Sequence, residues 1–190
     1  MAQQDENVQN ESVEQYIASL DDEQTAKDAR VLAGVMRRIS GEAPKLWNVG
    51  TLGFGEYHYK YDTGREGDNF ILGFYPRKGT TTIYLMDGTA RYGDLLSKLG
   101  KHMIKGYCII FKRLNDINLP GLEQILQQSY DHITALAKEG PIDRILWKTE
   151  KQVLPVCFRQ IQRNVDYAGR KPVGENVIQL SSYTTGQRVY

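Results

Sequence analysis

The sequence predicts one α+β domain: a mainly antiparallel four-stranded sheet with helices packed on one face, in the chain order ααβββαβα. Three observations predict this class. The chain has 190 residues, 41% hydrophobic and 25% charged, which suits one globular unit and is too short for two full-sized ones. Its apolar residues recur at helical spacing, then at every second position, then at helical spacing again. Clusters of Gly, Pro and charged residues separate these segments.

Two helices are expected at the start of the chain. Residues 12–15 (SVEQ) form a capping box, in which Ser12 and Gln15 can satisfy each other's free backbone donors. Asp21 or Asp22 is placed to cap a second helix, which Gly41 ends. Both segments carry apolar side chains three and four residues apart, so each helix is expected to pack one side against a sheet.

Three strands are expected next, as an antiparallel meander. Their apolar residues alternate with a period of two, over residues 52–61, 70–77 and 80–86. The connection over residues 62–68 is long for a hairpin loop, whereas Lys78 and Gly79 make a tight turn.

Two helices and one strand complete the predicted domain. A third helix is expected over residues 92–99, with Gly100 as its C-terminal cap. The apolar run 107–111 does not alternate, so it is predicted to be the central strand, covered on both faces. Pro120 suits the first turn of a last helix, and Gly140 stops it.

These elements divide the chain into three parts. Residues 1–11 are polar and are expected to be a disordered N-terminus. Residues 12–137 hold every apolar stripe that can be paired, and form the predicted domain. Residues 138–190 are expected to be a C-terminal extension, partly helical and then poorly ordered, because Gly, Ser, Thr and Arg dominate its end.

Composition narrows the classes of partner. No run of about 20 apolar residues could cross a bilayer, and the polar, acidic start does not resemble a signal peptide. A cytoplasmic protein without a membrane partner is therefore expected. Residues 105–112 half resemble the aromatic strand of an RNA-recognition domain, but Ile109 and Lys112 stand where aromatic rings are needed. With a net charge of +1, no nucleic-acid partner is expected.

The densest polar chemistry lies around the first two predicted strands. Alternation places Glu56, His58 and Lys60 on one face. Glu56 and His58 could share a divalent cation, with Glu66 or Asp68 from the following loop as a further oxygen ligand. The alternative is a solvated sheet face with cross-strand charge pairs. No nucleophile stands with a base and an orienting group at a spacing that indicates catalysis, so the chain is not expected to be an enzyme.

Four segments resemble the YdhG-like family of small bacterial domains of unknown function. They are residues 13–20 (VEQYIASL), 53–73 (GFGEYHYKYDTGREGDNFILG), 75–78 (YPRK) and 99–102 (LGKH). The resemblance covers residues 12–137 and implies an α+β domain in a cytoplasmic bacterial protein. Some family members carry a frataxin-like iron-chaperone label, which implies acidic and histidine residues that hold iron loosely. The candidates for this role are Glu56, His58, Glu66 and Asp68.

The leading expectation is a non-enzymatic domain that handles a small ligand or a metal ion. Its pocket would lie between the first hairpin and the helices, and would be lined by Trp47, His58, Tyr59, Arg65, Arg77 and Lys78. The alternative is a protein-interaction domain whose partner binds the exposed sheet face or the C-terminal tail.

Overall fold

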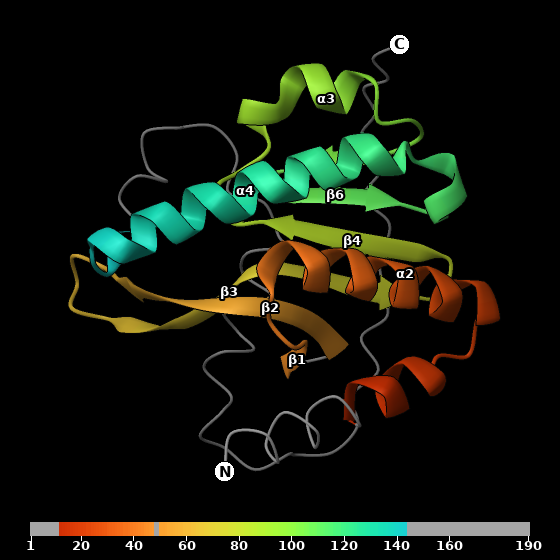
Figure 1. Ribbon diagram of the computed structural model, residues 1–190, viewed down its shortest axis with the longest axis horizontal. Helices are drawn as coiled ribbons and strands as arrows, with labels where there is room; N and C mark the ends of the chain where they lie inside the picture. Colours follow the sequence, from red (N-terminus) through yellow and green to blue (C-terminus); the bar gives the residue numbers. More distant parts are fainter. Residues whose placement is uncertain (1–11, 48–49, 144–190) are drawn as a thin grey trace, which may run out of the picture.

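The computed structural model describes residues 12–47 and 50–143 of this chain, and they form an α+β fold with an antiparallel sheet. A helix over residues 12–18 comes first (Figure 1). The elements that follow it are α2 (Glu23–Ser40), β1 (Lys45–Trp47), β2 (Thr51–Lys60), β3 (Glu66–Arg77), β4 (Thr80–Leu85), the 3-10 helix η2 (Ala90–Tyr92), α3 (Gly93–Ser97), β5 (Met103–Lys105), β6 (Cys108–Phe111), the 3-10 helix η3 (Leu114–Asp116), α4 (Leu119–Glu139) and β7 (Ile142–Asp143).

The sheet has more strands than the four that were predicted. Six strands lie in the order β1-β2-β3-β4-β6-β5, all antiparallel, and β7 pairs in parallel with the far end of β2. The additional strands β1, β5 and β7 are only three, three and two residues long, too short to show a period in the sequence. The prediction that residues 107–111 form the central strand was wrong, because β6 is the last strand but one and β3 and β4 occupy the centre.

The long helices begin and end where the capping signals placed them. The Asp22 side chain accepts a hydrogen bond from the backbone N–H of Thr25 at the start of α2. Gly41 closes α2 in the left-handed conformation, with φ of 70°. Asn118 caps α4, and Pro120 lies in its first turn, where its missing N–H costs no hydrogen bond.

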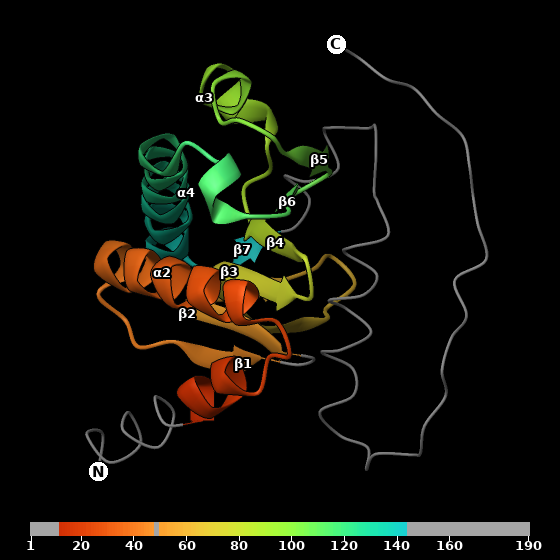
Figure 2. The same ribbon diagram turned by 90° about the vertical axis from the view of Figure 1, so that its right-hand side faces the viewer.

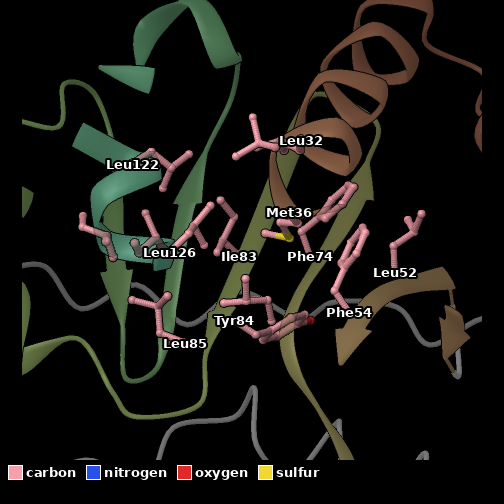
Figure 3. Packing of buried hydrophobic residues seen from close by; sticks show 14 of the residues in the cluster. Leu32, Met36, Leu52, Phe54, Phe74, Ile83, Tyr84, Leu85, Leu122 and Leu126 are labelled. Carbon is pink, nitrogen blue, oxygen red and sulfur yellow. The ribbon is translucent and has the colours of Figure 1, made fainter. Parts of the chain in front are cut away.

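The main core lies between the sheet and the helices α2 and α4, which cover the same face (Figure 2). Leu32 and Met36 of α2 and Leu126 of α4 pack toward Phe74 and Ile83 on the two central strands (Figure 3). All five side chains are fully buried. Burying a side chain of this size stabilises a fold by about 1.5–3 kcal/mol, so this layer is the main source of stability.

The opposite face of the sheet carries a second group of packed aromatic residues. The Phe70 ring lies 5.5 Å from the Trp47 ring and 5.9 Å from the Tyr84 ring, measured between centroids. Space for Phe70 comes from two glycines, since a Cβ on Gly53 or Gly73 would come within 2.7 Å of Phe70 atoms. We call Trp47, Phe70 and Tyr84 the aromatic face.

Two further predictions need correction, and others fall outside the described residues. The third helix, predicted over residues 92–99 with Gly100 as its cap, is α-helical only over Gly93–Ser97, follows the 3-10 helix η2, and has Lys98 as its C-cap. The loop over 62–68 is also shorter, because β3 begins at Glu66. The expected N-terminus over 1–11 and the extension from 144 onward lie outside the described residues. Within the described ranges, no helix is both long and apolar enough to span a membrane.

Candidate functional site

The predicted metal ligands lie on the β2–β3 hairpin, where alternation works as expected. Tyr57 and Tyr59 are buried, while Glu56, His58 and Lys60 point to the other side and are exposed. Glu66 and Asp68 belong to β3 and not to a loop. They stand directly opposite Lys60 and His58, so these four side chains share one face. We call Glu56, His58, Lys60, Glu66 and Asp68 the hairpin cluster.

Hydrogen bonds and ion pairs between the two strands connect the hairpin cluster. His58 Nδ1 lies 2.8 Å from Asp68 Oδ1, and His58 Nε2 lies 3.8 Å from Glu66 Oε2. Glu66 is also 3.5 Å from Lys60 Nζ, and Glu56 pairs with Lys45 of β1. These side chains are between 43% and 64% exposed. Ion pairs this exposed stabilise a protein by only about 0–1 kcal/mol each.

The lysines determine what the hairpin cluster can bind. Lys45 forms an ion pair with Glu56, and Lys60 forms one with Glu66. The positive charge of an ammonium group repels a metal ion beside it. Across residues 12–47 and 50–143, no group of three or more His, Cys, Asp or Glu side chains is arranged to hold a metal ion. The geometry therefore matches the solvated face with charge pairs more closely than a preformed metal site.

The structure places the residues of the predicted ligand pocket in separate regions. Trp47 packs on the aromatic face, whereas Tyr59 is buried against Tyr61 near the hairpin end of β2. Arg65 precedes β3 and Arg77 ends it, so about 40 Å of extended strand separates them. Arg77 lies over the Tyr75 ring, at 5.7 Å from its centroid.

A cavity that the sequence did not reveal lies at the start of α2. Its volume is about 220 Å³, and three segments line it: the first turn of α2, the β3–β4 turn and the end of β6. The residues are Asp22, Gln24, Thr25, Gly79, Lys112 and Arg113. We call this cavity the basic pocket. Of the predicted ligand residues, Lys78 belongs to this region, since it precedes Gly79 in the turn.

Positive charge predominates around the basic pocket. The Thr25 hydroxyl, which donates to Asp22 Oδ2 at 2.7 Å, lowers the pKa of Asp22, and the charge of Lys78 lowers it further. Asp22 is therefore a carboxylate at neutral pH. Neither Lys112 nor Arg113 forms an ion pair with another described residue. The lining thus holds two cations, Lys112 and Arg113, and one anion that already caps the helix, and the charge of Lys78 also acts on that anion.

A buried hydrogen-bond network at the other side of the core has a structural role. Ser129 of α4 donates to Asp87 Oδ1 at 2.6 Å, and the Tyr92 hydroxyl donates to Asp87 Oδ2. Burial and then the hydrogen bond to Asp87 raise the pKa of Tyr92 well above its usual value. No base contacts Ser129 except this carboxylate in the described chain, and the network joins the turn after β4, which holds Asp87, to η2 and α4.

Comparison with known proteins adds no relative to this picture. No protein-family model, curated protein or solved structure matches the chain. Two polar sites of the described chain are the candidates for function, the hairpin cluster and the basic pocket. The two differ in one respect that matters for binding. Each carboxylate of the hairpin cluster has a basic partner, which for Glu56 is Lys45 of β1. The cations that line the basic pocket have no ion-pair partner in the described chain.

Proposed function

We propose that this domain is a non-enzymatic binding protein for a small anionic ligand, which it holds in the basic pocket. The observation that carries the proposal is a cavity of about 220 Å³ lined by Lys112 and Arg113, two cations with no ion-pair partner in the described chain. Guanidinium and ammonium groups without an ion-pair partner attract carboxylate or phosphate groups.

The size of the basic pocket limits the ligand. Pockets for drug-sized molecules have volumes of roughly 300–1,000 Å³. A cavity of about 220 Å³ is smaller, so a phosphate-sized group fits it and a larger molecule would extend into solvent. Gly79 contributes a wall without a side chain, in the left-handed conformation with φ of 69°. The turn therefore leaves room for a ligand next to Lys78.

Calorimetric titration of the full chain with inorganic phosphate and pyrophosphate tests this function. We expect saturable binding, and Lys112→Ala combined with Arg113→Ala should weaken it about tenfold or more, which corresponds to about 1.4 kcal/mol. Binding should also weaken with added salt, since it depends on charge.

The matched control is Lys138→Ala, which removes one exposed cation from the last turn of α4. Lys138 is twenty residues from the N-cap Asn118, about 30 Å along the helix, and its loss should leave the affinity unchanged. Absence of saturable binding at millimolar phosphate and pyrophosphate, or an equal loss in the control, would contradict the proposal.

Iron handling is the second candidate, and the resemblance to YdhG-like domains is what implies it. The observation in its favour is His58, which has one carboxylate oxygen at 2.8 Å and another at 3.8 Å. Binding would use Asp68 and Glu66 as oxygen ligands. It would also require Glu66 to leave Lys60, so only weak binding is expected.

Titration with Fe(II) under anaerobic conditions distinguishes the two candidates. Under the iron proposal, His58→Gln with Asp68→Asn abolishes Fe(II) binding and leaves phosphate binding intact. Glu123→Gln is the matched control, because Glu123 lies on α4 and pairs with Arg38, away from the hairpin cluster. Wild-type protein that binds no Fe(II) at millimolar concentration would rule out this candidate.

A further inference from the structure

The hairpin cluster and the aromatic face lie on the same side of the sheet, and the residues in the middle of that side are buried. Phe70, Tyr84 and Cys108 are only 2%, 8% and 1% exposed. All three point away from α2 and α4: Phe70 lies over Gly73, which pairs with Tyr84, and Tyr84 pairs with Cys108. Side chains of cross-strand partners project from the same face of a sheet.

The described elements do not provide a layer over this face. Figure 2 shows α2 and α4 on the opposite side, and no helix drawn in colour lies over the aromatic face. An antiparallel sheet with one uncovered face normally has polar side chains there. Here β3 instead presents Phe70, β4 presents Tyr84, and β6 presents Cys108 and Ile110. Such side chains need an apolar cover.

The chain itself continues from a suitable place. β7 ends at Asp143, which pairs with Lys60 at the outer side of β2, so residues 144–190 start from the border of this sheet. Crossing six strands spans about 24 Å, which about eight extended residues cover, and 47 residues follow Asp143. The segment starts with the apolar run 145–147 (ILW), and a second run, 153–154 (VL), comes six residues later.

We propose that residues 144–190 dock against the aromatic face and form the second layer of this domain. We choose this segment of the same chain as the occupant for two reasons. It begins at the border of the sheet, and it carries aromatic and aliphatic residues that could cover the aromatic face. Trp147 is the residue best suited to pack on Phe70 and Tyr84, since aromatic rings prefer edge-to-face and offset contacts. The proposal does not depend on the ligand of the basic pocket.

Thiol accessibility tests the docking directly, because Cys108 lies on the covered face. The assay uses Cys157→Ser, which leaves Cys108 as the sole thiol of the chain. In this full-length variant, Cys108 should react slowly with a thiol reagent. Ending the same variant after Asp143 should increase the rate by about tenfold or more, because reaction then no longer requires the cover to open. An unchanged rate in a truncated protein that remains folded would overturn the proposal.

A measurement on the unmodified full chain decides the matter even if truncation prevents folding. Lys45 and Lys105 lie in the same cross-strand row as Tyr84, whereas Lys27 lies on α2. A lysine cross-linker should join Lys45 or Lys105 to Lys148 or Lys151, and should not join Lys27 to either.

The cross-linking is carried out on a mixture of isotopically light and heavy chains. Links within one chain support the proposal. Links that join light to heavy chains would show a second copy on the aromatic face, and links from Lys27 would place the segment elsewhere; either result overturns it.

Discussion

Gly73→Ala tests whether the aromatic face is as tightly packed as described. A Cβ at this position would lie 2.5 Å from Cε2, 2.7 Å from Cδ2 and 3.0 Å from Cζ of Phe70. The ring has little freedom to move, because Trp47 and Tyr84 hold it at centroid distances of 5.5 and 5.9 Å. The substituted chain must therefore displace a packed ring between its neighbours.

The magnitude follows from two opposing effects. Overpacking a well-packed site costs about 1–3 kcal/mol. Replacing a glycine in a strand removes its excess backbone entropy in the unfolded chain and offsets about 0.5–1 kcal/mol. We expect Gly73→Ala to lower the free energy of unfolding by about 1–2 kcal/mol, measured by urea denaturation of the full chain followed by circular dichroism.

A double-mutant cycle identifies Phe70 as the cause. Phe70→Leu removes the atoms that the new Cβ would strike, so Gly73→Ala should cost less in that background by about 0.5 kcal/mol or more. If Gly73→Ala changed stability by less than about 0.5 kcal/mol, or if the two effects simply added, Phe70 would be free to move and the description of the aromatic face would be wrong.

Other predictions concern the helices, the tyrosines and the last long strand. Gly34 lies exposed within α2 with no atom within 4 Å of an added Cβ, so Gly34→Ala should raise the free energy of unfolding by about 0.8–1 kcal/mol in the same urea titration. The buried Tyr57 hydroxyl has no hydrogen-bond partner in the described structure, so Tyr57→Phe should leave the free energy of unfolding unchanged or raise it. Tyr92→Phe removes a hydrogen-bond donor to Asp87 and should lower the free energy of unfolding by about 1–3 kcal/mol. Thermal melts in which Tyr57→Phe is the more destabilising of the two would contradict this prediction. Burial and Asp87 raise the pKa of Tyr92 above its usual 10.0, so the folded state favours the neutral phenol. This contribution to the free energy of unfolding is fully present below about pH 10 and is lost as the pH rises further. Tyr92→Phe has no phenol to ionise, so it should lose less stability than the wild-type protein above pH 10. Ile109 is fully buried although β6 is not central, so Ile109→Ala should still cost about 2–5 kcal/mol, and a smaller change than about 0.5 kcal/mol would show that the site is not packed.

The sequence predicted the elements that repeat a pattern over several turns or pairs. α2, α4 and the strands β2 to β4 each carry enough residues for a period, and Asp22, Gly41 and Pro120 mark helix ends by local chemistry. Strands of two or three residues such as β1, β5 and β7 have no period to detect. Their position is set by tertiary pairing, which a single sequence does not reveal.

For the hairpin cluster and the basic pocket too, the sequence did not reveal the contacts that depend on tertiary pairing. Alternation correctly placed Glu56 and His58 on one face, but charged residues at the start of β3 resembled a loop, so the pairing of Asp68 with His58 was not expected. The basic pocket depends on β4 and β6 lying side by side, which brings Gly79 close to Lys112 across 33 positions of the sequence. No local pattern connects those residues.

The two short strands beside β2 have a consequence for association between copies of this domain. An unpaired strand at the border of a sheet is a template for another chain, and proteins protect such borders to avoid aggregation. β1 pairs with the first three residues of β2 and β7 pairs with the last two, which leaves only residues 54–58 of this ten-residue strand without a strand partner at this border in the described chain. At the other border β5 offers only three residues, one of them Lys105. We therefore expect the folded domain to resist sheet-to-sheet polymerisation, and the loss of β7 to expose an aggregation-prone stretch of β2.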